Sequence, residues 1–239
     1  MNKLLEEKIS EKKNSSKAKV LSRFFKTGKG QYGEGDIFYG ITVPEQRKIV
    51  KEFSDISFEE ISKLLDSKVH EKRMIALLIL VKKYENAGKE KNERDKKEIF
   101  DIYISNAKKG NINNWDLVDL SSPNIIGKYL LDKNRKILYE LVKSENLWER
   151  RIAILATFTF IRNNEFEDAI KLSEKLLFDS HDLMHKAVGW MLREIGKRDK
   201  IILNKFLEEN YKNMPRTMLR YAIEKFDYNT RQEWLKRKN

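Results

Sequence analysis

Apolar residues recur at three- and four-residue spacing almost throughout this chain of 239 residues, and strict alternation of apolar and polar residues is nearly absent. This period matches an α-helix, in which residues three and four apart share one face. Only three prolines and ten glycines are present, so few positions can break a helix. The sequence therefore predicts an all-α fold.

Capping signals divide the pattern into separate helices. Thr42 and Ser57 are each followed three residues later by a glutamate, Glu45 and Glu60, as in a capping box. Periodicity and capping together predict helices near residues 2–12, 16–26, 44–53, 57–66, 70–87, 91–108, 114–120, 123–132, 134–144, 148–163, 165–178, 181–196, 199–212, 215–226 and 229–237.

The later helices repeat one local pattern, in which a basic residue precedes an alanine that looks buried. The segments begin at His70, Trp148, His181 and Pro215, and the last three starts lie 33 and 34 residues apart. Such periods are typical of stacked helix pairs. We expect a superhelical solenoid of antiparallel helix pairs whose basic residues form a stripe on the concave face. Ordinary amphipathic helices with a coincidental rhythm are the alternative.

The charge balance indicates an anionic partner. With 49 Lys and Arg against 37 Asp and Glu, the formal net charge is +12, which favours nucleic acid through phosphate neutralisation. A basic surface that serves solubility alone is the alternative. The chain has no cysteine, which excludes disulfides and thiolate metal sites. It lacks both the apolar core of a signal peptide and a run long enough to span a membrane, which predicts a cytoplasmic protein without membrane contact.

The glycine-rich stretch from Gly28 to Gly35 formally contains G-x-G-x-x-G. A dinucleotide site requires a strand before this motif and a helix at its last glycine, whereas here a helical segment precedes it. A mobile loop that lets backbone amides and Tyr32 approach a phosphate backbone is one interpretation, and a plain connection between helices is the other.

A second motif resembles a zinc site. His181 and His185 lie one turn apart around Asp182, as in H-E-x-x-H sites. The acidic residue is Asp, one methylene shorter than the general base of that motif, and His181 stands at the expected helix start. A helix cap is the simpler role, and we expect no metal.

The tryptophans carry the clearest functional signal. Trp115 and Asp119 are four residues apart and share a helix face, which indicates either a structural ion pair or chemistry on a developing positive charge. Asp116 faces away and would complement the helix dipole.

Trp190 lies within one turn of Lys186 and Arg193, which favours partial exposure on a phosphate-binding face. Trp148 opens a helix and is expected in the core. Taken singly, each tryptophan also fits a core position.

Four motifs carry a family resemblance: Asn-Trp-Asp-Leu-Val-Asp at 114–119, Trp-Glu-Arg-Arg-Ile-Ala at 148–153, Lys-Ala-Val-Gly-Trp-Met-Leu-Arg-Glu at 186–194 and Pro-Arg-Thr-Met-Leu-Arg-Tyr-Ala at 215–222. With Tyr-Gly-Ile-Thr-Val-Pro-Glu at 39–45, they make the chain resemble AlkD-like DNA alkylation repair enzymes over roughly residues 18 to 235. The resemblance implies a superhelix of HEAT-like repeats. We expect a single domain of such repeats over residues 1–239, with residues 1–14 as an N-terminal helical extension. The resemblance also implies excision of cationic N3- or N7-alkylated purines from double-stranded DNA.

The family's functional residues carry over position by position. The resemblance implies that Asp119 is the catalytic aspartate, that Trp115 and Trp190 are the active-site tryptophans, and that Arg151 is the DNA-binding arginine. That last match could instead fall on the adjacent Arg150. The further candidates for DNA contact are Lys186, Arg193, Tyr32 and Arg220.

One carboxylate suffices for this chemistry. Glycosidic cleavage passes through an oxocarbenium-like state, and an alkylated purine is already cationic, so no acid is needed to protonate it. We therefore expect a monomeric hydrolase without metal or cofactor, nucleoid-associated when bound to DNA. The alternatives are a non-catalytic protein that binds DNA structures, and a protein-binding scaffold in which Asp119 forms an ion pair with Arg151.

Overall fold

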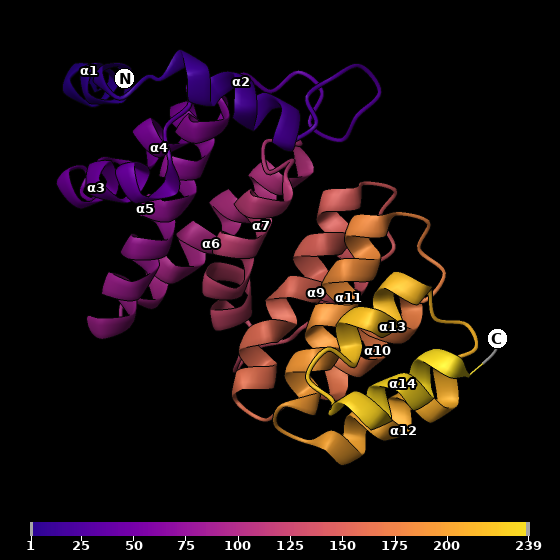
Figure 1. The fold of residues 1–239 in the computed structure, drawn as a ribbon. Helices are drawn as coiled ribbons and strands as arrows, with labels where there is room; N and C mark the ends of the chain where they lie inside the picture. The colour runs from indigo at the N-terminus through magenta and orange to yellow at the C-terminus, as the bar shows by residue number, and fades with distance from the viewer. Residues whose placement is uncertain (1, 238–239) are drawn as a thin grey trace. The chain divides into compact units, whose positions relative to one another are not determined.

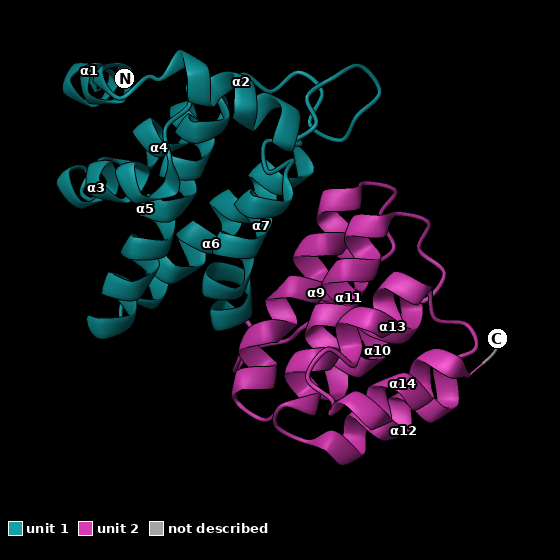
Figure 2. Ribbon diagram, viewed as in Figure 1, with its two compact units in different colours: residues 1–129 teal, residues 130–239 magenta. Residues whose placement is uncertain are grey.

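The computed structural model describes residues 2–237, and within that range the chain is helical apart from turns, loops and one isolated bridge between Ile37 and Val69. The all-α prediction is thus confirmed. The chain divides into two compact units, residues 1–129 and residues 130–239 (Figure 2). The single domain expected over 1–239 stays a prediction. No helix in the described range is long and apolar enough to cross a membrane.

Unit 1 is built around its longest helix, α5. Its helices are α1 (Lys3–Glu11), α2 (Ser15–Phe24), α3 (Val43–Glu52), α4 (Phe58–Leu65), α5 (His70–Lys89), α6 (Glu93–Lys108) and α7 (Trp115–Ser122), followed by the π-helical turn η1 (Pro123–Gly127) (Figure 1). Helices α3, α4, α6 and α7 all pack against α5. The α5 sequence is apolar on every side between Met74 and Leu80, as expected of a helix enclosed by others.

The N-terminal helix belongs to this packed core. Leu5 and Ile9, one turn apart on α1, are both fully buried, and α1 packs against α3. The expected helical extension is therefore anchored to unit 1 by its apolar face.

Helix α7 does not end where the sequence predicts. Separate helices were expected at 114–120 and 123–132, with a break before Pro123. Instead the π-helical turn η1 continues α7 directly through Pro123 to Gly127. Proline lacks an N–H and crowds the preceding turn, and the wider π-helical turn accommodates it without interrupting the helix.

The two predicted capping boxes differ in outcome. Ser57 caps α4 with both hydrogen bonds of the box, to and from Glu60, so this prediction is confirmed. Thr42 occupies the N-cap position of α3, but its side chain makes no capping hydrogen bond. Glu45 instead forms ion pairs with Lys12 and Lys48, and the predicted box at Thr42 is wrong.

Unit 2 consists of successive helix pairs. Its helices are α8 (Lys136–Leu141), α9 (Leu147–Arg162), α10 (Glu167–Lys175), α11 (Asp182–Gly196), α12 (Lys200–Asn210), α13 (Arg216–Ala222) and α14 (Tyr228–Lys236). Helix α11 packs between α9 and α13 (Figure 1). Helices α8 and α10 pack against α9, and α12 packs against α11. The alanines of the repeated pattern, Ala153, Ala187 and Ala222, are buried as predicted.

Gly189 sets the distance between α11 and α13. A Cβ at this position would lie 2.5 Å from the backbone oxygen of Met218 and 2.5 Å from Cβ of Tyr221. Only glycine permits this approach, which brings the Trp190 segment of α11 against α13.

Candidate functional site

Helix α7 places Trp115 and Asp119 one turn apart. Asn114 is the N-cap, and its buried Oδ1 accepts a hydrogen bond from the Trp115 backbone N–H at 2.9 Å. Leu117 and Val118, between Trp115 and Asp119 in the sequence, are fully enclosed. Trp115 and Asp119 are half-buried. The helix therefore anchors its apolar face in unit 1 and leaves the indole and the carboxylate partly accessible.

Trp115 belongs to an aromatic stack that the sequence analysis missed. Its ring stacks on Phe25 with centroids 5.2 Å apart, Phe25 stacks on Phe38 at 5.1 Å, and Phe38 stacks on the imidazole of His70 at 4.5 Å. Phe24 meets Trp115 edge-on at 5.8 Å and is 60% exposed. Aromatic pairs contribute about 0.5–1.5 kcal/mol each beyond their burial, so the stack constrains the plane of the indole.

Asp119 lies within electrostatic reach of Tyr103, a fully buried residue on α6 whose hydroxyl is 2.9 Å from Oγ of Ser121. Burial raises the pKa of Tyr103 well above its usual range, and the negative charge of Asp119 raises it further. Tyr103 is therefore a neutral neighbour of the carboxylate at any pH at which the protein would work.

Asp116 has a larger role than the predicted one. Its Oδ1 accepts a hydrogen bond from the Leu117 N–H at 2.8 Å, but its Oδ2 lies 2.9 Å from Nε2 of His70. The other ring nitrogen, Nδ1, is 3.1 Å from Oδ2 of Asp36, and Asp36 pairs with Arg73 at 2.7 Å. All four charged residues are buried. The interpretation of Asp116 as a simple partner of the helix dipole was incomplete.

This cluster perturbs the acid–base behaviour of its members. Burial disfavours the imidazolium, but hydrogen bonds to Asp116 and Asp36 outweigh burial and raise the pKa of His70 to about 8. Burial alone would raise the pKa of Asp36, yet the hydrogen bond with His70 and the charge of Arg73 bring it below its usual value. His70 is therefore a cation at neutral pH.

Sequence spacing offers no signal for this cluster, because Asp36 and Asp116 lie 34 and 46 positions from His70. For the aromatic stack the sequence offers only a weak indication, because Phe25 and Phe38 flank the glycine-rich loop.

In unit 2, Trp190 lies on α11 and is half-buried, which confirms its predicted partial exposure. Its ring centroid is 5.6 Å from that of Phe158, and the guanidinium of Arg162 lies 4.1 Å above the Phe158 ring. Trp148 is only 7% exposed, as expected for a core residue.

The two cations that flank Trp190 are paired within unit 2. Nζ of Lys186 lies 2.6 Å from a carboxylate oxygen of Asp182, and Arg193 forms an ion pair with Glu224. Part of the positive charge expected around Trp190 is therefore balanced by these carboxylates.

Arg150 and Arg151 occupy different surroundings. Nε of Arg150 lies 2.7 Å from Asp179, and its guanidinium also donates to two backbone carbonyls. Arg151 is only 4% exposed and donates to the Leu183 carbonyl at 2.6 Å. Both arginines have partners within unit 2. Arg220, on α13, is exposed.

The histidine pair of unit 2 has structural roles. His181 is the N-cap of α11, and its Nδ1 accepts a hydrogen bond from the Leu183 N–H at 3.2 Å, which confirms the predicted cap. Burial lowers the pKa of His181, which keeps the ring a neutral acceptor. Nε2 of His185 lies 2.5 Å from the backbone oxygen of Asp179.

The glycine-rich loop connects α2 to the bridge residue Ile37. A Cβ at Gly33 would lie 2.4 Å from the carbonyl oxygen of Phe25, so glycine is needed for this close turn. Tyr32 is half-buried, and Nζ of Lys26 lies 5.7 Å from the centre of its ring. The loop follows a helix rather than a strand, which excludes a dinucleotide site of the G-x-G-x-x-G type.

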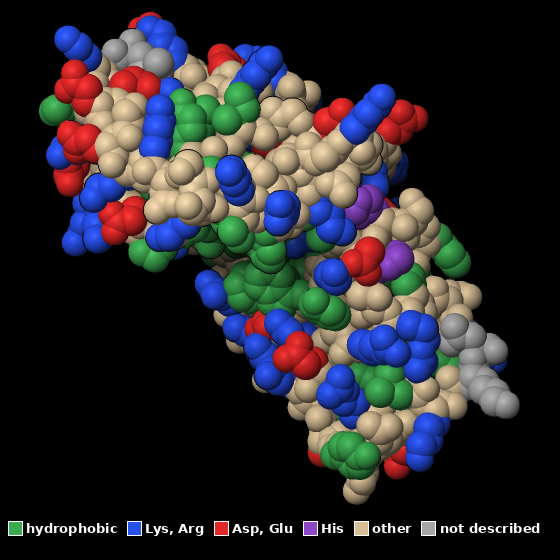
Figure 3. All heavy atoms as spheres, turned by 45° about the horizontal axis from the view of Figure 1, so that its top comes forward, with side chains coloured by type: hydrophobic (Ala, Val, Ile, Leu, Met, Phe, Trp, Pro, Cys, Tyr) green, Lys and Arg blue, Asp and Glu red, His purple; other side chains and the backbone are tan. Residues whose placement is uncertain are grey.

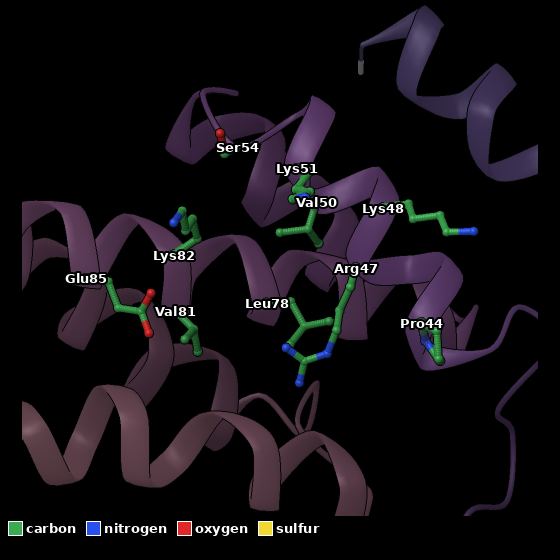
Figure 4. A pocket seen from close by; sticks show the side chains of 10 residues that line it. All are labelled: Pro44, Arg47, Lys48, Val50, Lys51, Ser54, Leu78, Val81, Lys82 and Glu85. Atoms are coloured by element: carbon green, nitrogen blue, oxygen red, sulfur yellow. The ribbon is translucent and has the colours of Figure 1, made fainter.

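A groove between α3 and α5 gathers cations on unit 1. It encloses about 510 Å³ over the apolar side chains of Val50, Leu78 and Val81. Its cationic lining consists of Arg47, Lys48, Lys51 and Lys82, and Glu85 is its acidic member (Figure 4).

Three of these cations are available to a ligand. Within residues 2–237, Arg47, Lys51 and Lys82 form no ion pair, whereas Lys48 pairs with Glu45. Lys and Arg side chains are spread over the visible face of the molecule, with Asp and Glu side chains among them (Figure 3).

Comparison with known proteins gives a consistent assignment. The model of the DNA alkylation repair enzyme family matches residues 5–226. A predicted DNA alkylation repair enzyme from Enterococcus faecalis shares the fold, with a TM-score of 0.68 at 17% identity over 91% of this chain and 98% of that one. The crystal structure of AlkD2 from Streptococcus mutans gives a TM-score of 0.50 at 19% identity, over 89% of this chain and 98% of that one.

A sequence search of curated proteins finds no match to this chain. The two solved structures are too distant in sequence to indicate more than the fold, whereas the family match extends over nearly the whole chain. This protein therefore belongs to the DNA alkylation repair enzyme family.

Proposed function

We propose that this protein is a DNA glycosylase that releases cationic N3- or N7-alkylated purines from double-stranded DNA, with Asp119 as its catalytic carboxylate. The observation that carries the proposal is the position of Trp115 and Asp119 on one half-buried face of α7, in a chain of the DNA alkylation repair enzyme family. The protein would act as a monomer in the cytoplasm, associated with the nucleoid, without metal or cofactor.

The chemistry requires little beyond one carboxylate. Cleavage of the N-glycosidic bond develops positive charge on the sugar. A cationic alkylated purine departs as a neutral base, so no general acid is required. Asp119 would stabilise the sugar cation electrostatically and orient the attacking water. Tyr103, held neutral by burial, adds no competing negative charge.

The remaining roles follow from the family resemblance. The faces of Trp115 and Trp190 would attract the cationic nucleotide, each by about 0.5–2 kcal/mol. Arg151, or the adjacent Arg150, would hold a phosphate through two parallel hydrogen bonds. The further contacts with the DNA backbone would come from Lys186, Arg193, Tyr32 and Arg220.

The groove between α3 and α5 supports a polyanionic partner. Arg47, Lys51 and Lys82 line it without forming ion pairs within the described residues 2–237. Cations of this kind release counterions when they bind phosphates, which supplies most of the sequence-independent affinity for DNA.

The first test is the release of N7-methylguanine from duplex DNA by the wild type and by Asp119→Asn. We expect the substitution to reduce single-turnover base release by about 100- to 1,000-fold, the usual effect of removing one preorganised electrostatic group. Duplex affinity should be unchanged or slightly higher, since a negative charge is lost.

Asp101→Asn is the matched control, because Asp101 is an exposed residue of α6 and the chemical change is the same. This variant should release base at the wild-type rate. Equal rates for wild type and Asp119→Asn would refute the mechanism. Tight, lesion-independent binding without any base release would instead indicate a protein that binds DNA structures. Duplex binding that is weak and insensitive to salt would indicate a protein-binding scaffold.

A further inference from the structure

Three segments of unit 1 meet at one buried histidine. His70, at the start of α5, places Nδ1 3.1 Å from Asp36 at the end of the glycine-rich loop, and Nε2 2.9 Å from Asp116 in the first turn of α7. The side chain of His70 is only 2% exposed. This histidine is therefore a direct link between the loop and the helix that carries Trp115 and Asp119.

Both hydrogen bonds require the protonated ring. An imidazolium donates from both nitrogens, whereas a neutral imidazole has one donor and one acceptor. Each nitrogen of His70 faces a carboxylate oxygen, so a neutral ring would turn a lone pair toward one of them. With His70 protonated, the cluster holds two cations and two anions. Without that proton it carries an uncompensated buried negative charge, which is costly.

The other groups around the ring leave this balance unchanged. Arg73 on α5 pairs with Asp36 at 2.7 Å and donates to the side chain of Asn113 at 2.9 Å. The neighbouring Glu71 is turned to backbone N–H groups of residues 39–41. On the next position, Lys72 pairs with Glu6 of α1 at 2.6 Å. No other carboxylate hydrogen-bonds to the ring among the described residues 2–237.

Two paths lead from His70 to Trp115. The polar path runs through Asp116, which directly follows Trp115 in α7. The apolar path runs through Phe38 and Phe25, which stack in sequence between the imidazole and the indole. A change in the cluster would therefore move both the backbone and the ring support of Trp115.

We propose that protonated His70 is a positioning residue, which holds the first turn of α7 so that Trp115 and Asp119 are placed for base release. The proposal rests on the proposed glycosylase function for its catalytic consequence, but the coupling of His70 to Trp115 is independent of that function. Deprotonation of His70 loosens the first turn of α7, so base release falls as pH rises. The raised pKa of His70, about 8, puts this fall just above neutral pH.

The kinetic test compares wild type with His70→Gln across pH 6.5–9.5, with spontaneous depurination subtracted. Glutamine can donate to only one of the two carboxylates. We expect single-turnover release by His70→Gln to be about 10- to 100-fold slower, as for a small misplacement of catalytic groups. Duplex affinity should stay at the wild-type value. The wild-type rate should fall with a midpoint near the pKa of His70, and this fall should be absent in His70→Gln.

His185→Gln, a histidine substitution in unit 2, is the control and should keep the wild-type rate and pH profile. Asp116→Asn removes one anionic partner of His70, which lowers the pKa of the imidazole, so its alkaline fall should begin at a lower pH. This second variant keeps the test decisive if His70→Gln does not fold. An alkaline fall that persists unchanged in His70→Gln, or in Asp116→Asn, would overturn the proposal.

An NMR titration gives a readout that needs no catalysis. The chain has four tryptophans, and Trp115→Phe identifies the Trp115 indole resonance. We expect that resonance to shift with the same midpoint as the His70 ring. If wild type releases no base but the two titrate together, the glycosylase proposal fails and the positioning role stands. If the Trp115 indole resonance does not respond to His70, the positioning role fails whatever the activity.

Discussion

At the scale of single residues, four charges lie buried together in unit 1. Asp36 and Asp116 are the anions, and His70 and Arg73 are the cations. Charges buried in this way are tolerated only when each has a partner, and removal of one partner commonly costs about 3–5 kcal/mol. The cluster is thus a sensitive point of the fold as well as a support for α7.

The raised pKa of His70 predicts how stability depends on pH. The pKa of His70 is about 8 in the folded protein, against an ordinary value of 6.5, so the folded state binds the proton more tightly than the unfolded chain. Protonation of His70 therefore contributes on the order of 2 kcal/mol to the free energy of unfolding. This contribution is fully present below pH 6.5 and is lost as pH rises through about 8.

Urea unfolding at pH 6 and pH 9 checks this expectation. The free energy of unfolding of wild type should fall more steeply between these two values than that of His70→Gln. At acidic pH the dependence is reversed, because the pKa of Asp36 is lowered in the folded protein. The stabilisation that ionised Asp36 contributes should be lost as pH falls below the usual pKa of an aspartate. Equal pH dependence in wild type and His70→Gln between pH 6 and 9 would contradict the expected stabilisation.

At the scale of helices, close approach decides how α11 and α13 pack. An alanine at Gly189 would place Cβ 2.5 Å from the backbone oxygen of Met218, which cannot move without shifting α13. We expect Gly189→Ala to lower the free energy of unfolding by about 1–3 kcal/mol, as for other overpacked sites. Thermal or urea unfolding measures the change.

Gly88→Ala on α5 is the matched control. Its nearest neighbour would be Cε of Lys96, at 3.9 Å from the new Cβ, so there is room for a methyl group. Alanine is the better helix former, and we expect a gain of about 0.5–1 kcal/mol. If Gly189→Ala proved as stable as Gly88→Ala, the packing of α11 on α13 would be looser than the structure indicates.

The helices themselves were largely predictable. Their bounds follow from apolar periodicity and caps such as Ser57 and His181, which are local properties of the sequence. The continuation of α7 into η1 was not predictable, because Pro123 normally marks a break and only the surrounding packing decides that a π-helical turn absorbs it.

At the scale of the whole molecule, a net charge of +12 does not identify which cations meet a ligand. Arg73 and Arg150 belong to the repeated basic pattern, and Arg193 flanks Trp190. All three form ion pairs with carboxylates of the protein itself. Arg47, Lys51 and Lys82 of the groove between α3 and α5 have no such partner within residues 2–237. The basic concave stripe stays a prediction.

The groove predicts a measurable salt effect. If Lys51 and Lys82 bind phosphates, the double variant Lys51→Gln/Lys82→Gln should bind duplex DNA more weakly. The slope of log K against log salt should become shallower by up to about 0.9 per lysine. Fluorescence anisotropy at several salt concentrations measures both quantities.

Lys97→Gln is the control for the groove, because Lys97 lies on α6 and pairs with Asp101. Its slope should match that of wild type. If the slope of log K against log salt were unchanged in the double variant, these lysines would be excluded from the DNA interface. Base release by the double variant at low salt, where DNA binding is strong, would show whether the substitutions also affect catalysis.

The sequence by itself determined the helical class, the approximate ends of most helices, and the placement of Trp115 and Asp119 on one helix face, because all of these depend on residues within a turn or two of each other. Only the tertiary structure decided the partners of charged and aromatic side chains. His70 contacts Asp36 and Asp116, which are 34 and 46 positions away in the sequence. Trp115, at the start of α7, stacks on Phe25, the C-cap residue of α2. Such contacts arise from the packing of whole helices, which no local spacing encodes.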